Sequence, residues 1–132
     1  MKLIVAVNKL GYIGLNDTLP WRSSEDLKHF KKMTEGCKLL VGRKTFESMP
    51  PLKGREVIVV GTGYNTLEDA LRQSPDWIIG GASIYEQTSH LCDEHHISII
   101  DDDTIGDTKL NSLEGSDYTT TYLYYFKTNQ KK

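Results

Sequence analysis

Short apolar runs alternate with helix-forming stretches along this chain. The runs rich in β-branched residues predict buried strands at 2–7, 38–41, 57–60, 77–79, 97–100 and 119–126. Between them, capping residues and glycines predict helices that begin after Ser23 or Ser24, at 43–49, at 66–71 and around 84–90. Strands that alternate with short helices are typical of an α/β fold with a largely parallel sheet.

The helix that begins at Ser23 or Ser24 carries the first candidate for chemistry. It ends at Gly36 and turns one stripe of side chains inward, namely Leu27, Phe30, Met33 and Thr34. Asp26 either shares this apolar face or faces solvent in the first turn, where an acid stabilises the helix. On the apolar face its carboxylate would be partly desolvated, with a raised pKa suited to proton transfer.

Three loops carry further candidates. Residues 8–22 contain two glycines, an Asn-Asp pair and a proline, which predicts a long loop, and loops of that length are often functional. The strand-to-helix turns at 42–45 (GRKT) and 80–83 (GGAS) let the backbone approach a ligand at a helix start. Neither turn matches the P-loop or the usual Rossmann fingerprint, but two such turns in a small domain indicate a ligand with several phosphates.

Composition narrows the class of protein. The 132 residues suit one domain over 1–132, and no apolar run approaches the ~20 residues of a membrane span. The first eight residues are too short for a signal peptide. A pI of about 6.1 argues against general nucleic-acid binding, and two cysteines, Cys37 and Cys92, fit a reduced cytoplasmic protein. A net charge of +4 over residues 1–72, against −8 over 73–108, predicts that cations binding an anion lie in the first half.

Other reaction types receive little support. The four histidines follow no metal-ligand pattern, so no metal is expected; they are His29, His90, His95 and His96. Ser83 lacks a nucleophile elbow, and Cys37 is expected to be a small buried residue. Arg55 is either a surface charge or a fork for a carboxylate.

Six motifs follow one another in a fixed order along the chain. They are YIG with LPW at 12–21, Asp26 with Phe30 and Lys31, GRKTFES at 42–48, PLKGR at 51–55, IGGASIY at 79–85 and GDT at 106–108. Together they resemble dihydrofolate reductase over residues 4–108, and the C-terminal segment matches loosely. The resemblance implies a mixed, mostly parallel central sheet flanked by helices, with an antiparallel C-terminal strand.

The activity that the resemblance implies is NADPH-dependent reduction of 7,8-dihydrofolate to tetrahydrofolate, an oxidoreductase step of one-carbon metabolism. Hydride would pass from nicotinamide C4 to pterin C6, with protonation at N5. The expected partner is this small-molecule substrate, and a monomer is expected. Two alternatives remain: a non-catalytic folate- or nucleotide-binding scaffold of the same fold, and a reductase of another pterin or of a riboflavin precursor. Asp26, Trp21 and Arg55 favour the active folate enzyme.

The resemblance also assigns roles to individual residues. Asp26 would be the catalytic acid, oriented by Ser98 and bridged through water by Trp21. The substrate residues would be Ile4, Val5, Ala6, Asp26, Leu27, Phe30, Lys31, Met49, Leu52, Arg55 and Ile79. The cofactor residues would be Ala6, Ile13, Gly14, Gly42, Arg43, Lys44, Thr45, Gly80, Gly81, Ala82, Ser83, Ile84 and Tyr85. The peptide bond between Gly80 and Gly81 is expected to be cis.

Several departures from the family pattern concern the far end of the cofactor. The segment at 61–64 is short and lacks the serines and the basic residue that line the adenosine pocket. Ser83 stands where many members carry an arginine near the 2′-phosphate. Arg43 and Lys44 still favour NADPH over NADH, but we expect weaker cofactor binding and a smaller preference. The short Pro50-Pro51 junction is expected to reshape the pocket for the substrate tail.

Overall fold

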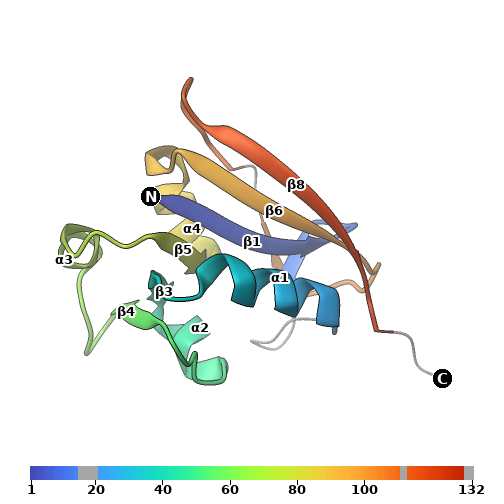
Figure 1. Ribbon diagram of the computed structural model, residues 1–132, viewed down its shortest axis with the longest axis horizontal. Helices are drawn as coiled ribbons and strands as arrows, with labels where there is room; N and C mark the ends of the chain where they lie inside the picture. Colours follow the sequence, from blue (N-terminus) through green and yellow to red (C-terminus); the bar gives the residue numbers. More distant parts are fainter. Residues whose placement is uncertain (15–20, 111–112, 130–132) are drawn as a thin grey trace.

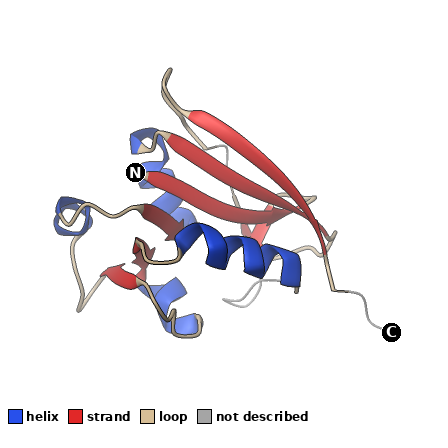
Figure 2. Cartoon of the chain, viewed as in Figure 1, coloured by secondary structure: helices blue, strands red, loops and turns tan. Residues whose placement is uncertain are grey.

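A six-stranded sheet forms the centre of the molecule, and helices cover both of its faces (Figures 1 and 2). The computed structural model describes residues 1–14, 21–110 and 113–129. The sheet contains β1 (Lys2–Asn8), β3 (Lys38–Gly42), β4 (Glu56–Val60), β5 (Trp77–Gly80), β6 (Glu94–Asp101) and β8 (Thr120–Lys127). The strands lie in the order β4-β3-β5-β1-β6-β8, and each neighbouring pair is parallel. The six predicted strands and the α/β class are therefore confirmed.

The helices follow the capping signals of the sequence. They are α1 (Ser24–Thr34), α2 (Arg43–Ser48), α3 (Leu67–Arg72), α4 (Ala82–Thr88) and the 3-10 turn η1 (Ser89–Leu91). Thr66 caps α3 by accepting a hydrogen bond from the Asp69 amide, because its hydroxyl satisfies an N–H that has no partner within the helix. Within the described parts of the chain, no helix is long and apolar enough to cross a membrane.

The core is divided between the two faces of the sheet, because alternate side chains of each strand point to opposite faces. On one face, Leu3, Val5 and Ile78 pack with Ala70 of α3 and Ile84 of α4. On the other face, Ile4, Leu39 and Trp77 of the sheet pack with Phe30 and Met33 of α1. This second face also carries the cavity described below.

The C-terminal strand runs in the opposite direction to the one expected. The resemblance implied an antiparallel strand, but β8 is parallel to β6, with Glu94 opposite Thr120 and Asp101 opposite Lys127. Residues 102–119 return the chain to the start of β6, where the Thr120 amide donates to the Asp93 carbonyl at 2.9 Å. A connection of this length permits the crossover that a parallel pair requires, whereas an antiparallel neighbour needs only a short turn.

The long loop expected at 8–22 is partly ordered as a strand. β2 (Tyr12–Gly14) pairs in antiparallel fashion with β7 (Thr108–Lys109). Neither strand was predicted, because two or three residues are too few to show a period of hydrophobicity. Residues 15–20, which include part of the LPW motif, lie outside the described residues.

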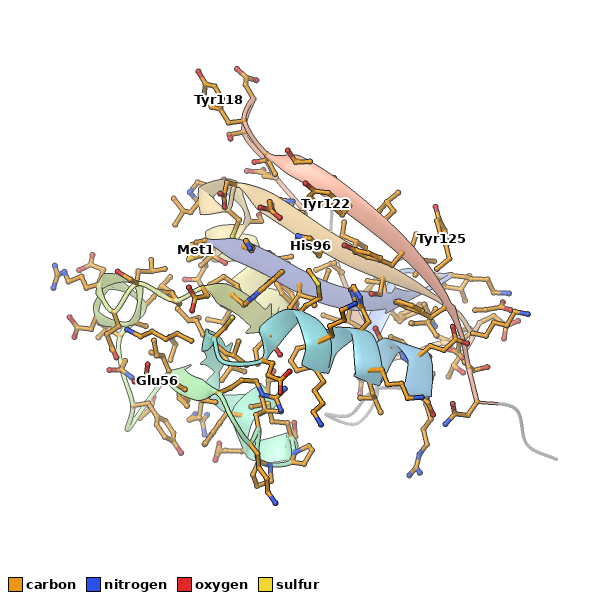
Figure 3. The ribbon with its side chains drawn as sticks, viewed as in Figure 1. Met1, Glu56, His96, Tyr118, Tyr122 and Tyr125 are labelled. Atoms are coloured by element: carbon orange, nitrogen blue, oxygen red, sulfur yellow. The ribbon has the colours of Figure 1, made fainter. Side chains whose placement is uncertain are left out.

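An aromatic layer joins β8 and β6 to α1. His96 of β6 stacks on Tyr122 of β8, with ring centroids 4.5 Å apart (Figure 3). The His96 ring also contacts the Tyr124 hydroxyl at 2.9 Å, and His29 of α1 lies 4.2 Å from the Tyr124 ring, centroid to centroid. These contacts fix the face of α1 that lies against the sheet.

Candidate active site

A cavity of about 490 Å³ lies on the α1 face of the sheet. It collects residues from segments that are far apart in the sequence, because the carboxyl ends of the parallel strands β1, β5 and β6 meet at the same edge. Its lining residues are Ile4, Val5, Ala6, Ile13, Asp26, Leu27, Phe30, Lys44, Thr45, Ser48, Met49, Pro50, Leu52, Ile79, Gly80, Gly81, Ala82, Tyr85, Ser98 and Thr108. The wall is largely apolar, with few polar groups, as in sites that enclose a small molecule.

Asp26 is the acidic residue of this wall. The Ser23 hydroxyl caps α1 and accepts a hydrogen bond from the Asp26 amide at 3.3 Å, so the carboxylate belongs to the first turn of the helix. The residue is only 7% exposed. Burial raises the pKa of this carboxyl, and a hydrogen bond from Ser98 lowers it in part. The interpretation of Asp26 as an inward-facing acid is confirmed.

Tyr85 belongs to the same wall and is 4% exposed. Its hydroxyl donates a hydrogen bond to the carbonyl of Ile4 at 2.8 Å. Burial, and to a smaller extent the charge of Asp26, raises the pKa of Tyr85, so the phenol stays neutral. The hydroxyl therefore connects α4 to β1 in the wall of the cavity.

Near the starts of α2 and α4, glycines at 42, 80 and 81 let the two strand-to-helix turns approach each other closely. The peptide bond between Gly80 and Gly81 is cis, as predicted. A Cβ on Gly81 would lie 2.8 Å from the Thr45 hydroxyl oxygen, and one on Gly42 would lie 3.1 Å from the Ile84 side chain. Positions 42 and 81 therefore favour glycine, because any other residue would bring its Cβ into these close contacts next to the start of α2.

Two cations flank these glycines. Lys44 lines the cavity, and Arg43 forms an ion pair with Glu47 at 3.0 Å between Nη1 and Oε1. Together with the Thr45 hydroxyl and the open glycine backbone, they supply the donors and positive charge that a phosphate-bearing cofactor needs. The residues present therefore fit a dinucleotide that extends from the apolar cavity to this edge.

Comparisons with known proteins decide between the possible families. The family model described as dihydrofolate reductase matches residues 1–132. The chain belongs to the dihydrofolate reductase family. The enzyme class and the NADPH cofactor expected from the sequence are thereby confirmed.

Individual dihydrofolate reductases agree with this family model. The chain is 35% identical to dihydrofolate reductase type 9 of Escherichia coli in an alignment of 134 positions that covers 84% of this chain and 76% of the relative. It is 37% identical to the dihydrofolate reductase of Mycoplasma genitalium in an alignment of 118 positions that covers 74% of each chain. A solved dihydrofolate reductase from Enterococcus faecalis, complexed with NADP(H) and RAB-propyl, aligns with a TM-score of 0.78 at 29% identity and covers 86% of this chain and 77% of that one.

Most of the residues expected from the resemblance to dihydrofolate reductase line the cavity. Among the others, those that do not line it are Trp21, Lys31, Gly42, Arg43, Arg55, Ser83 and Ile84. Trp21 is 7% exposed, and its indole N–H has no hydrogen-bond partner among the described residues. Arg55 donates hydrogen bonds to the Thr34 hydroxyl at 3.3 Å and to the Lys53 carbonyl at 3.0 Å, beyond the end of α1. Lys31 is exposed on α1.

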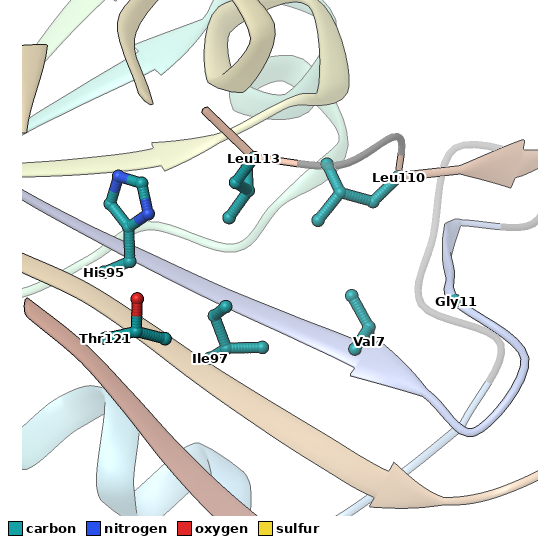
Figure 4. Close-up of a pocket in the computed structure, with 7 residues that line it drawn as sticks. All are labelled: Val7, Gly11, His95, Ile97, Leu110, Leu113 and Thr121. Carbon is teal, nitrogen blue, oxygen red and sulfur yellow. The ribbon is translucent and has the colours of Figure 1, made fainter. Parts of the chain in front are cut away.

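Three residues of the cavity wall were not assigned from the sequence. Ser48 and Pro50 lie beside assigned neighbours, and Thr108 belongs to the quoted GDT motif, which was the available signal. A further hollow of about 340 Å³ on the opposite face of the sheet is lined by Val7, Gly11, His95, Ile97, Leu110, Leu113 and Thr121 (Figure 4). None of its lining residues is among those assigned to catalysis, substrate binding or cofactor binding.

Proposed function

We propose that this cavity is where the chain reduces 7,8-dihydrofolate to tetrahydrofolate. The observation that carries the proposal is the buried carboxylate of Asp26, which faces a largely apolar cavity and is oriented by Ser98. Such a site can hold a polar ring edge by a charge-assisted hydrogen bond while excluding water. The glycine turn and the cations next to it account for the second ligand.

On the substrate side, Asp26 pairs with N3 and the 2-amino group of the pterin. Ser98 keeps the carboxylate oriented. The amino group has a second N–H, which the backbone carbonyls of Ile4 and Ile79 share as acceptors. The benzoyl ring lies against the apolar wall, which consists of Leu27, Phe30, Met49 and Leu52. Arg55, held by Thr34, binds the α-carboxylate of the glutamate tail as a bidentate fork.

Proton delivery depends on the surroundings of Asp26. When bound, NADPH supplies the hydride that reduces pterin C6. The carboxylate acts in a desolvated environment, where its charge interacts more strongly than in water with the proton that arrives at N5. The buried indole N–H of Trp21 is available to hold a bridging water at this point.

The cofactor is held by backbone and side-chain groups at the other end of the cavity. The backbones of Ala6 and Ile13 bind the carboxamide of the nicotinamide. Phosphates bind at the starts of α2 and α4, where the donors are Arg43, Lys44, Thr45 and the backbone of 81–84. The smaller preference for NADPH follows from Ser83, whose hydroxyl accepts from Gln87 at 3.0 Å and carries no charge.

The test is a turnover assay with a matched pair of variants. Wild type is expected to consume NADPH with dihydrofolate, seen as loss of absorbance at 340 nm, and Asp26→Asn is expected to lower kcat by roughly 10²- to 10⁴-fold. The control is Asp69→Asn, which removes an acid from the first turn of α3 and is expected to leave turnover unchanged. A wild type that binds folate and NADPH without turnover would favour the non-catalytic scaffold.

We also propose that residues 1–132 act as one domain, as a monomer in the cytoplasm. Cys37 and Cys92 are both free thiols, which agrees with a reducing compartment. Gel filtration with light scattering tests the oligomeric state, and a dimer at micromolar concentration would contradict the monomer.

A further inference from the structure

Asn8, the last residue of β1, is a buried amide whose polar atoms are all used. The residue is 1% exposed. Its side-chain oxygen accepts hydrogen bonds from the amides of Leu10 at 3.1 Å and Tyr12 at 3.0 Å. Its side-chain nitrogen donates to the Asp102 carboxylate at 3.1 Å and to the Thr104 carbonyl at 2.6 Å. Two accepted and two donated bonds are the full capacity of an asparagine side chain.

The four partners belong to two segments that leave the sheet side by side. β1 and β6 are parallel, with Asn8 opposite Ile100, so residues 9–14 and 102–110 start at the same edge. The two segments meet again where β2 pairs with β7, and the Leu110 amide donates to the Gly11 carbonyl at 3.0 Å. We call residues 9–14 and 102–110 together the β2–β7 flap. Asn8 joins both halves of this flap to the end of β1.

The flap forms one wall of the cavity. Ile13 of β2 and Thr108 of β7 are both lining residues, whereas Asp26, Leu27 and Phe30 come from α1 on another side. A change in the position of the flap therefore alters the wall near Ile13 and leaves the α1 wall in place.

The bonding pattern requires asparagine in particular. An aspartate would place an oxygen where the side-chain nitrogen now donates to the Thr104 carbonyl and the Asp102 carboxylate, so attraction would become repulsion. An alanine would leave the partly buried backbone amides of Leu10 and Tyr12 without the acceptor that the Asn8 side chain provides, and would remove both donated bonds as well.

We propose that Asn8 is a positioning residue for NADPH binding, because it fixes the β2–β7 flap and with it Ile13 and Thr108. This inference rests on the proposed function, in which the backbone of Ile13 binds the nicotinamide carboxamide. Asn8 acts through the flap and touches neither ligand.

The main experiment compares Asn8→Ala with wild type in direct binding and in turnover. Asn8→Ala is expected to raise the Kd for NADPH, measured by quenching of tryptophan fluorescence, by about tenfold. The KM for NADPH rises in parallel, whereas the KM for dihydrofolate stays within about twofold, because the α1 wall is intact. Because both amides donate to Asn8, hydrogen exchange at Leu10 and Tyr12 is expected to be slower in wild type than in the variant.

A matched control lies at the start of the same flap. Lys9 of the flap forms an exposed ion pair at 2.8 Å with Asp101, the last residue of β6, so Lys9→Ala also removes a link between the flap and the sheet but leaves the buried Asn8 side chain in place. It is expected to leave both KM values unchanged, since exposed ion pairs contribute little. Asn8→Asp is expected to lower the affinity for NADPH. The double variant Asn8→Asp with Asp102→Asn is expected to recover part of it, because the carboxylate, now at position 8, accepts from the amide, now at position 102.

Each outcome decides one claim. An unchanged Kd for NADPH in folded Asn8→Ala, or an equal rise of both KM values, would overturn the positioning role. If Asn8→Ala does not fold, Asp102→Ala provides the same test with one partner removed, and a Kd unchanged there overturns it equally. A wild type that binds NADPH but never reduces dihydrofolate contradicts the proposed function and leaves the binding test of Asn8 valid.

Discussion

Asp26 and Asp69 occupy the same position of two capped helices and yet lie in opposite environments. In each case the backbone amide donates to the hydroxyl of the capping residue three positions earlier, at 3.3 Å to Ser23 and 3.2 Å to Thr66. The Asp69 side chain is 59% exposed and pairs with Arg72, whereas Asp26 is 7% exposed in the cavity wall. Packing of α1 against the sheet, and not the local helix signal, turns one of these acids into a candidate for catalysis.

Asp26→Asn is expected to stabilise the fold while it lowers kcat. Burial raises the folded pKa of Asp26 above its ordinary value of 3.8. Between these two pKa values the folded state binds more protons than the unfolded state, so the free energy of unfolding falls as pH rises through that window. Asparagine has no charge to desolvate, so urea denaturation at pH 7 should show a higher free energy of unfolding for the variant than for wild type.

The advantage of Asp26→Asn should shrink as pH falls through the raised pKa of the folded state and level off below 3.8, where the wild-type carboxyl becomes neutral in both states. Asp69→Asn serves as the control and is expected to lose a little stability, since it removes an exposed acid from a helix start. A variant Asp26→Asn that is less stable than wild type at pH 7 would show that the charged carboxylate is favoured in the fold.

Ser98→Ala is expected to raise the pKa of Asp26 further. The hydrogen bond from Ser98 lowers the pKa of this carboxyl against the effect of burial, so its removal leaves desolvation unopposed. The pKa can be followed through the chemical shift of the Asp26 carboxyl carbon during a pH titration. Ser98→Thr keeps the hydroxyl and should titrate like wild type, and an unshifted curve for Ser98→Ala would remove Ser98 from its orienting role.

The sequence alone predicted the strands of the main sheet and most of the cavity wall. Apolar runs such as 38–41 and 57–60 are short, β-branched and bounded by turn residues, which leaves few alternatives to a buried strand. Asp26 was harder to interpret, because the capping signals before Asp26 and Asp69 are alike. The family motifs decided in favour of an inward-facing Asp26, and the burial of the residue agrees.

The features that escaped prediction depend on contacts between distant segments. The direction of β8 follows from how residues 102–119 cross back to β6, which no hydrophobic period records. The bonds of Asn8 join residues 94 and 96 positions apart, and a lone asparagine after a strand carries no sign of them. β2 and β7 were missed for the same reason, because each is ordered by the other.

Arg55→Leu should separate a folate enzyme from a reductase of a tail-less pterin. The guanidinium is held by Thr34 and the Lys53 carbonyl, which leaves part of the fork for a carboxylate. We expect the KM for dihydrofolate to rise by at least about tenfold, with little change in kcat, because the lost contact is equal in ground and transition states. The KM for a dihydropterin without the glutamate tail should not change; an equal rise for both substrates would refute the clamp.

Gly81→Ala should weaken both stability and cofactor binding, and a second substitution should restore part of the stability. The added methyl group would lie 2.8 Å from the Thr45 hydroxyl oxygen, too close for a side chain fixed on a helix. Overpacking of this kind costs about 1–3 kcal/mol. Thr45→Ala removes the clashing oxygen, so thermal unfolding should show Gly81→Ala with Thr45→Ala to be more stable than Gly81→Ala alone. If the double variant loses as much stability as the two single variants together, the strain does not come from the contact with the Thr45 hydroxyl.

Glu47 is expected to limit the affinity for NADPH. Its carboxylate pairs with Arg43 at 3.0 Å, and both side chains are partly exposed, at 39% for Arg43 and 50% for Glu47. Glu47→Gln frees the guanidinium and removes a charge that repels phosphate, so Kd for NADPH should fall by about two- to fourfold at low salt.

Arg43→Ala should reduce the ratio of kcat/KM for NADPH to that for NADH. Arg72→Ala, which breaks a comparable exposed pair on α3, should change neither value. Equal kcat/KM for the two cofactors in wild type would mean that Arg43 and Lys44 do not read the 2′-phosphate.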